Sequence, residues 1–406
     1  MTVNLLPYTM IKEILKRPFV RPLFIWIVGI ILQINHSVQM LSFGLLIIPL
    51  VMIFVSALLC GKAKPEASYS MRWAWGSVFL PLLLFLSIQM TSYHERLPVR
   101  DPNGLEIKAR EIQQKLLLPI DKMSLTEAEK SVLSALALGY QDTMPKEIRR
   151  QFSLTGVAHI LAVSGFHVAV ICGFISFFLS FLPNNTACRW AKYLLTLLLC
   201  WSFTVVSGLA PSAVRSAIMF SLYQTGRQLR RQTDSYNTMA ASAFCMLVYD
   251  PFYLYDIGFQ LSYIAVVFIL YLHPKLNRLL YVRNPLLAKP WECLTVTLAA
   301  QVGVTFLCQY YFGQFSTVFL FTNLPLALIA TILMPVSLLW LLLPAGLPGM
   351  GLLQSGIECL THWMMQIVDV FSRIPGSSIS FEFGFGSMLV GYLLLFLSFS
   401  FFYNKR

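Results

Sequence analysis

Four short polar motifs interrupt the apolar stretches of this chain, and they hold its most versatile side chains. Each motif breaks a hydrophobic run with glycine, proline or polar residues. If those runs cross a membrane, such irregular backbone is tolerated only where protein buries it or water reaches it. The motifs therefore predict a polar vestibule that leads into a helical bundle. They are Ser164-Gly-Phe-His167, Gly208-Leu-Ala-Pro211-Ser-Ala-Val-Arg215, Asp250-Pro with Asp256-Ile-Gly-Phe-Gln260-Leu-Ser262, and Phe312-Gly-Gln-Phe315.

Arg215 is the motif residue that costs most to place inside an apolar span. A guanidinium binds phosphate through two parallel N–H donors, so this position suits an anionic substrate that carries phosphates. An ion pair with Asp250 or Asp256 is the structural alternative, and the sequence leaves both interpretations open. The net charge of +12 decides little between them, because most of the excess lies in short basic loops.

The other motif residues also have structural alternatives. Ser164 and His167 lie three residues apart, as a hydrolase pair could, but no third group or oxyanion site accompanies them, and His167 is otherwise a core histidine. Gly165 permits close packing of helices, and Pro211 suits the first turn of a helix. As substrate-pathway residues we take Ser164, Gly165, His167, Pro211, Ser212, Arg215, Asp256, Gln260, Ser262 and Gln314.

No enzymatic centre is expected in this chain. The sequence has no G-x-x-x-x-G-K-[ST] loop, so ATP hydrolysis through a P-loop is excluded. Its six histidines and eight cysteines are scattered and show no metal-ligand spacing. We therefore expect neither a metal ion nor another cofactor.

The elements that must position the motifs are membrane-spanning helices. Hydrophobic residues make up 57% of the 406 positions and charged residues 12%, about half the share in a soluble domain. Many apolar runs approach the ~20 residues that cross the hydrocarbon layer, without the alternation of a β-barrel. We predict an all-α, polytopic transmembrane helical bundle of roughly 10–12 spans with a small helical extracytoplasmic insertion. The expected spans are Leu23–Ile34, Met40–Cys60, Trp73–Met90, Ile160–Leu182, Tyr193–Ser207, Pro211–Gln224, Asn237–Tyr249, Ile257–Leu272, Thr295–Tyr311, Val318–Leu343 and Ser387–Phe402.

Short loops rich in Lys and Arg indicate the orientation of these spans. Lys12, Lys16, Arg17 and Arg21 predict a cytoplasmic amino terminus, and no cleavable signal peptide is evident before the first span. Every strongly basic short loop then falls on the cytoplasmic side, and all four polar motifs fall at extracytoplasmic ends. The expected location is the cytoplasmic (inner) membrane.

The stretch Thr91–Ala158 is the predicted extracytoplasmic insertion, and its middle has a helical pattern. Ser124-x-x-Glu127 matches a capping box at the start of a helix, and Gly139 matches a helix end.

Two segments near the carboxyl end each allow two interpretations. Val318–Leu343 contains two prolines and is either one kinked span or two half-spans. Gly356–Arg373 is either an amphipathic helix at the membrane surface or a span that faces the bundle. We expect four parts in all: an amino-terminal transmembrane segment (1–92), the insertion (93–155), a channel core (156–345) and a final part with the amphipathic helix and last span (346–406).

At its motifs the chain resembles the ComEC competence protein family, over about Thr126 to Leu343. Order and spacing make a chance match improbable. The matching blocks are Glu127–Gly139 (family pattern E-x-x-L-x-A-L-x-L-G), Gly156–His167 (G-x-x-H-L-L-A-I-S-G-L-H), Gly208–Met219 (G-x-x-P-S-x-x-R-A-x-x-M), Asp250–Ser262 (D-P…G-F-Q-L-S) and Gln301–Asn323 (Q…F-G-x-F…N).

The resemblance implies a channel that carries single-stranded DNA into the cytoplasm during natural transformation. It also implies partners: a DNA receptor, a pilus-like uptake machine, a cytoplasmic helicase and, here, a separate nuclease, besides membrane lipids; an oligomer is left open. Many relatives carry an OB-fold insert and a metallo-β-lactamase-like domain, whereas this chain ends soon after a span. We therefore expect a short form without nuclease activity. A transporter of another anionic substrate is the alternative.

Overall fold

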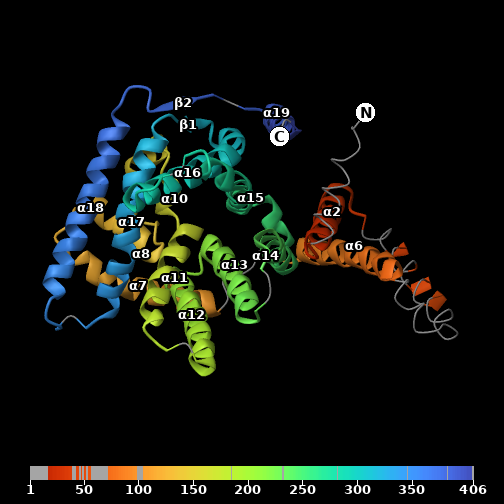
Figure 1. The fold of residues 1–406 in the computed structure, drawn as a ribbon, viewed down its shortest axis with the longest axis horizontal. Helices are drawn as coiled ribbons and strands as arrows, with labels where there is room; N and C mark the ends of the chain where they lie inside the picture. The colour runs from red at the N-terminus through yellow and green to blue at the C-terminus, as the bar shows by residue number, and fades with distance from the viewer. Residues whose placement is uncertain are drawn as a thin grey trace. The chain divides into compact units, whose positions relative to one another are not determined.

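The computed structural model describes residues 17–38, 72–97 and 104–404, except 184, 231–232, 281, 345 and 382, together with isolated positions between 43 and 55 (Figure 1). The predicted span Met40–Cys60 lies mostly outside the described residues, as do Lys12 and Lys16. The described chain is helical, as predicted, apart from two three-residue strands. It divides into two compact units, residues 1–101 with 229–260 and residues 102–228 with 261–406. The four parts expected from the sequence stay a prediction.

The first unit is built from helices that approach each other closely through small residues. A Cβ on Gly29 would lie 2.6 Å from Ser87 Oγ, so α2 and α6 pack backbone to backbone here. Ser87 Oγ donates a hydrogen bond of 2.6 Å to Trp26 O, and Trp26 Nε1 donates one of 3.1 Å to Leu247 O of α14. The elements are α2 (Val20–His36), α6 (Arg72–Arg96), α14 (Ser235–Tyr249) and the 3₁₀ helix η1 (Pro251–Tyr255).

The second unit contains most of the polar motifs. Helices α11, α12 and α13 lie side by side, and α17 and α18 pack along each other (Figure 1). Helix α15 (Ile257–Asn277) begins in the first unit and continues into the second. The other elements are α7 (Gly104–Asp121), α8 (Glu127–Leu138), α9 (Lys146–Leu154), α10 (Ala158–Leu161), α11 (Gly165–Ser180), α12 (Thr186–Val206), α13 (Pro211–Gln228), α16 (Pro285–Phe312), β1 (Gln314–Ser316), α17 (Phe319–Leu342), α18 (Met350–Ser372), β2 (Ser378–Ser380) and α19 (Phe385–Asn404).

Helix α8 occupies the core of the second unit. Its residues from Ser131 to Leu138 are all buried, and it packs against α7, α17 and α18. The predicted insertion is therefore helical, as expected, and it shares its hydrophobic core with α17 and α18.

The predicted capping box of α8 is wrong by two residues. The N-cap is Thr126, whose Oγ1 accepts a hydrogen bond from Glu129 N, while Glu129 Oε2 accepts one from Thr126 N. Both Ser124-x-x-Glu127 and Thr126-x-x-Glu129 fit the S/T-x-x-E pattern, and the register that buries Val132 to Leu138 selects the second. The predicted helix end at Gly139 is confirmed, with φ +71°.

Among the described residues, three helices are long and apolar enough to cross a membrane: Ile257–Asn277, Leu287–Phe312 and Phe319–Leu342. Shorter apolar helices occupy Val20–His36, Gly165–Ser180 and Phe385–Phe399. The chain is thus an all-α membrane protein, and the total of 10–12 spans stays a prediction.

The structure decides between the two interpretations of Val318–Leu343, and one predicted span is broken. The two interpretations of Gly356–Arg373 stay predictions. Helix α17 is continuous despite Pro325 and Pro335. Helix α18 is amphipathic and buries one face, which includes Ile357 and Met364, against the core. The predicted span Ile160–Leu182 is wrong as a single helix, because the chain leaves helical geometry between α10 and α11.

Candidate substrate pathway

The break between α10 and α11 lies at the centre of the candidate site. Ala162 and Ser164 have extended backbone conformations, so carbonyl groups before them lose their helical partners. Side chains from elsewhere in the unit bond to those carbonyls: Gln141 Nε2 donates to Leu161 O at 2.8 Å, and Ser212 Oγ donates to Val163 O. A non-helical segment is thereby satisfied inside the protein, which is the condition for irregular backbone at membrane depth.

Ser164 and His167 form the start of α11. His167 Nδ1 accepts a hydrogen bond from Ser164 N at 3.2 Å and lies 2.9 Å from Ser164 Oγ, and the ring is fully buried. Its other hydrogen bond among the described residues is with the Ile160 backbone. The pair therefore has the geometry of a helix cap, with no acidic group bonded to the imidazole. Gly165 is exposed, and a Cβ there would lie 3.3 Å from Ser216 Oγ of α13.

The turn between α12 and α13 brings a second motif to the same place. Gly208 (φ +70°) and Leu209 (φ +55°) are both left-handed, which reverses the chain within a few residues. Gln113 of α7 lies against Gly208, and its Nε2 donates a 2.6 Å hydrogen bond to Leu138 O at the end of α8. The adjacent Gly139 would contact Val163 if it carried a Cβ.

The last family block joins the same region from α16 and α17. Thr322 Oγ1 donates a 2.8 Å hydrogen bond to Thr155 O, and Gly156 (φ +76°) packs against Ser316 and Phe319. We call this meeting of α8, α10–α11, α12–α13 and β1–α17 the motif junction.

Arg215 lies on α13, one turn after Pro211, and is 3% exposed. Pro211 is exposed and Ser212 is half-buried, so the first turn of α13 runs from an accessible end to a buried cation. Pro211 begins the helix, as the structural alternative predicted. Asp250 and Asp256 belong to the other compact unit, and both interpretations of Arg215 stay predictions.

The Asp250–Ser262 motif caps its own helices. Asp250 Oδ1 accepts a 2.9 Å hydrogen bond from Phe252 N, and Asp256 Oδ1 accepts one of 2.6 Å from Phe259 N. Gln260 Nε2 donates to Leu254 O at 2.9 Å. Ser262 is half-buried on α15 and belongs to the second unit, whereas the rest of the motif belongs to the first.

Gln314 lies at the edge of the motif junction. It is exposed, and its Oε1 accepts a 3.4 Å hydrogen bond from Ser153 Oγ of α9. Its strand, β1, pairs antiparallel with β2 in the register Gln314 opposite Ser380. The structure thus brings three of the four motifs together in one unit.

Two functional candidates at the motif junction were missed from the sequence. His159 forms a side-chain hydrogen bond with Asn323, and Asn323 Nδ2 donates a 2.7 Å hydrogen bond to Thr297 Oγ1 of α16. His159 is exposed on α10. The signal was present, because both residues stand as polar exceptions inside the apolar family blocks.

The α11–α13 segment contains basic residues but no acidic ones. The sequence contains no Asp or Glu between Glu147 and Asp234, while Arg189, Lys192 and Arg215 all fall in that interval. These three helices therefore carry positive charge only, and any counter-charge must come from another part of the protein or from a ligand.

These observations define a class: an all-α membrane protein in which a broken helix, a tight interhelical turn and a buried arginine meet. The chain belongs to the Competence protein family, whose sequence model matches residues 136–406. It is similar to ComE operon protein 3 of Bacillus subtilis (strain 168), with 26% identity over 288 residues, which are 67% of this chain and 35% of that protein.

A second relative is the uncharacterized protein YcaI of Escherichia coli (strain K12), with 26% identity over 149 residues, 35% of this chain and 19% of that protein. The chain thus aligns with about a third or less of each of these relatives. No solved structure matches the chain.

Proposed function

We propose that this protein is an inner-membrane channel that carries single-stranded DNA into the cytoplasm during natural transformation. The single observation that carries the proposal is the motif junction, where three polar motifs lie in one unit and Ser212 and Gln141 stabilise a broken helix near buried Arg215. That the substrate is DNA is inferred from membership of the Competence protein family. The amino terminus lies in the cytoplasm, and the motif junction faces outward.

In this proposal the accessible rim of the junction receives the strand. Gly165, Phe166 and Pro211 are exposed there, and Phe166 offers an aromatic face for base stacking. Arg215 then contacts a phosphate inside the bundle. The attraction between a guanidinium and a phosphate is strongest there, because little water is present to screen it. His159 is exposed on α10 and offers the strand a further hydrogen-bonding side chain.

The protein acts without enzymatic activity of its own. A DNA receptor delivers the strand, a separate nuclease removes its complement, and a cytoplasmic helicase pulls it through. These partners, like the DNA, follow from the family and belong to the proposal.

Deleting the gene and measuring uptake of fluorescent DNA into the cytoplasm tests the proposal. We expect uptake to be lost and restored by the wild-type chain; unchanged uptake would refute it. In the complemented strain, Arg215→Gln is expected to lower uptake at least tenfold, because a hydrogen bond to a charged group contributes about 1.5–3 kcal/mol. Arg150→Gln, on exposed α9 and paired with Glu147, is the matched control and should transport normally. Equal uptake by both variants would leave Arg215 only a structural role.

A further inference from the structure

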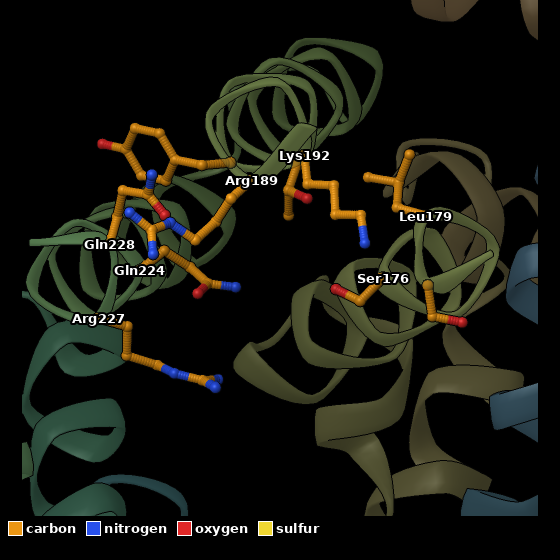
Figure 2. A pocket seen from close by; sticks show the side chains of 10 residues that line it. Ser176, Leu179, Arg189, Lys192, Gln224, Arg227 and Gln228 are labelled. Atoms are coloured by element: carbon orange, nitrogen blue, oxygen red, sulfur yellow. The ribbon is translucent and has the colours of Figure 1, made fainter. Parts of the chain in front are cut away.

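A polar pocket lies at the ends of α11, α12 and α13 that are opposite the motif junction. Helix α11 ends there at Ser180, α12 begins after Asn185, and α13 ends at Gln228. Its volume is about 310 Å³. Figure 2 shows side chains from the three helices converging on this space. The lining residues used below are Arg189, Lys192, Tyr193, Gln224, Arg227 and Gln228.

Three cations surround the pocket, and none of its lining residues is acidic. Arg189 extends from α12 toward Gln224 and Gln228 of α13, while Arg227 enters from the end of α13 (Figure 2). Lys192 Nζ donates a 2.7 Å hydrogen bond to Leu182 O, which ties α12 to the end of α11. Positive charges that line one pocket repel one another, so an anion among them would lower the electrostatic energy.

Two donors at the pocket are buried and have no hydrogen-bond partner among the described residues. They are Arg189 Nε and Gln228 Nε2. A buried donor without an acceptor is costly, and native proteins satisfy almost all such groups. A tetrahedral phosphate offers several acceptor oxygens, so one phosphate can bond an arginine and an amide together.

The surroundings of the pocket indicate where that phosphate comes from. Helix α12 has 21 residues, a length of about 31 Å that matches the hydrocarbon layer. Its outer side carries exposed Leu194 and Leu198, and exposed Trp190 stands one turn before Leu194. Tryptophan beside cations at the end of a helix with exposed leucines is typical of the membrane surface.

We propose that this pocket binds the phosphate headgroup of an anionic phospholipid, whose acyl chains lie along the apolar side of α12. Basic pockets between helices at a membrane surface commonly bind such headgroups. The site is separate from the motif junction and independent of the proposed DNA transport. Its role is to anchor the ends of α11–α13 at the surface of the membrane.

The test uses the full chain purified in nanodiscs of zwitterionic phosphatidylcholine, into which phosphatidylglycerol is titrated. We expect phosphatidylglycerol to raise the melting temperature and to be retained in native mass spectrometry. Arg189→Gln with Arg227→Gln should weaken this effect about tenfold or more, since each removes a charge-assisted bond. Arg149→Gln with Arg150→Gln on α9 is the matched control and should respond as wild type.

Additional experiments distinguish a lipid headgroup from free phosphate as the ligand. The single variant Arg227→Gln removes a more exposed cation and keeps the test valid if the double variant fails to fold. Inorganic phosphate at equal concentration should not reproduce the effect, because it has no acyl chains. The proposal is overturned if phosphatidylglycerol does not stabilise wild type, if both double variants respond alike, or if free phosphate or a single-stranded oligonucleotide displaces the lipid.

Discussion

Gly156 of the motif junction should accept a side chain only at a large cost in stability. Its φ of +76° lies in the left-handed region, and a Cβ there would stand 2.7 Å from Phe319 Cβ and 2.8 Å from Ser316 Cβ. Both neighbours meet it with atoms next to their own backbone, which cannot swing away. Alanine at this position must therefore push β1 and the start of α17 away from α9 and α10.

The cost of Gly156→Ala can be worked out from two parts. The left-handed conformation costs an alanine about 1–2 kcal/mol. Overpacking a tight contact adds about 1–3 kcal/mol, which gives a total of about 2–5 kcal/mol. Gly208→Ala has the same conformational cost, but its added Cβ would come no closer than 3.0 Å to its nearest neighbour, the amide end of Gln113, so about 1–2 kcal/mol is expected.

Gly173→Ala is the matched control, because nothing lies within 4 Å of its added Cβ on α11. Alanine there should stabilise the helix by about 0.5–1 kcal/mol. Denaturant titration of the three purified variants in one detergent measures the order directly. A Gly156→Ala protein as stable as Gly208→Ala, or as wild type, would refute the packing described at the motif junction.

Three further changes test individual contacts. Thr126→Ala removes the cap of α8 and should lower the free energy of unfolding by about 0.5–2 kcal/mol, measured by denaturant titration. Burial alone would raise the pKa of Glu129, but hydrogen bonds from Thr126 and His362 hold it below its usual value. Its stabilisation is therefore complete above the unfolded-state pKa and is lost as pH falls through the folded-state pKa, so Glu129→Gln should flatten the acid side of the stability profile. Ser212→Ala leaves Val163 O without its side-chain donor and should cost about 1–3 kcal/mol.

Each of these changes has a control of the same chemistry. Ser124→Ala should cost less than Thr126→Ala, because Ser124 precedes the cap; the reverse order would contradict the capping assignment. Ser202→Ala removes an exposed hydroxyl that only bonds Leu198 O within α12, so its effect should be small beside that of Ser212→Ala. A stability profile of Glu129→Gln parallel to wild type would refute the role of Glu129.

Hydropathy was sufficient to locate most helices, because a span must be apolar over its whole length. The predicted Asn237–Tyr249, for example, differs from α14 by two residues at its start. The break at Ala162–Ser164 could not be found this way, since Leu161, Ala162 and Val163 are themselves apolar. It is stabilised by Gln141 and Ser212, 20 and 49 residues distant in sequence from the carbonyls they bond.

The sequence predicted part of the candidate site, as it predicted part of the fold. The sequence selected Ser164, Ser212 and Arg215 because polar residues are conspicuous in apolar runs, and the structure places them in one unit. His159 and Asn323 are conspicuous as polar residues too, but only the fold shows that they bond each other and join α10 to α17. The capping role of Ser164 and His167 follows from where α11 begins, which hydropathy does not determine.

Photocrosslinking in living cells shows directly whether DNA touches the motif junction during uptake. Phe166 is 38% exposed, and Phe166→benzoylphenylalanine places a photoreactive ring of similar shape there. Trp363→benzoylphenylalanine on α18, 60% exposed, is the aromatic control. On illumination of cells taking up labelled DNA, we expect the strand to crosslink at position 166 and not at position 363. Equal crosslinking at both positions, or none at 166 while uptake proceeds, would contradict it.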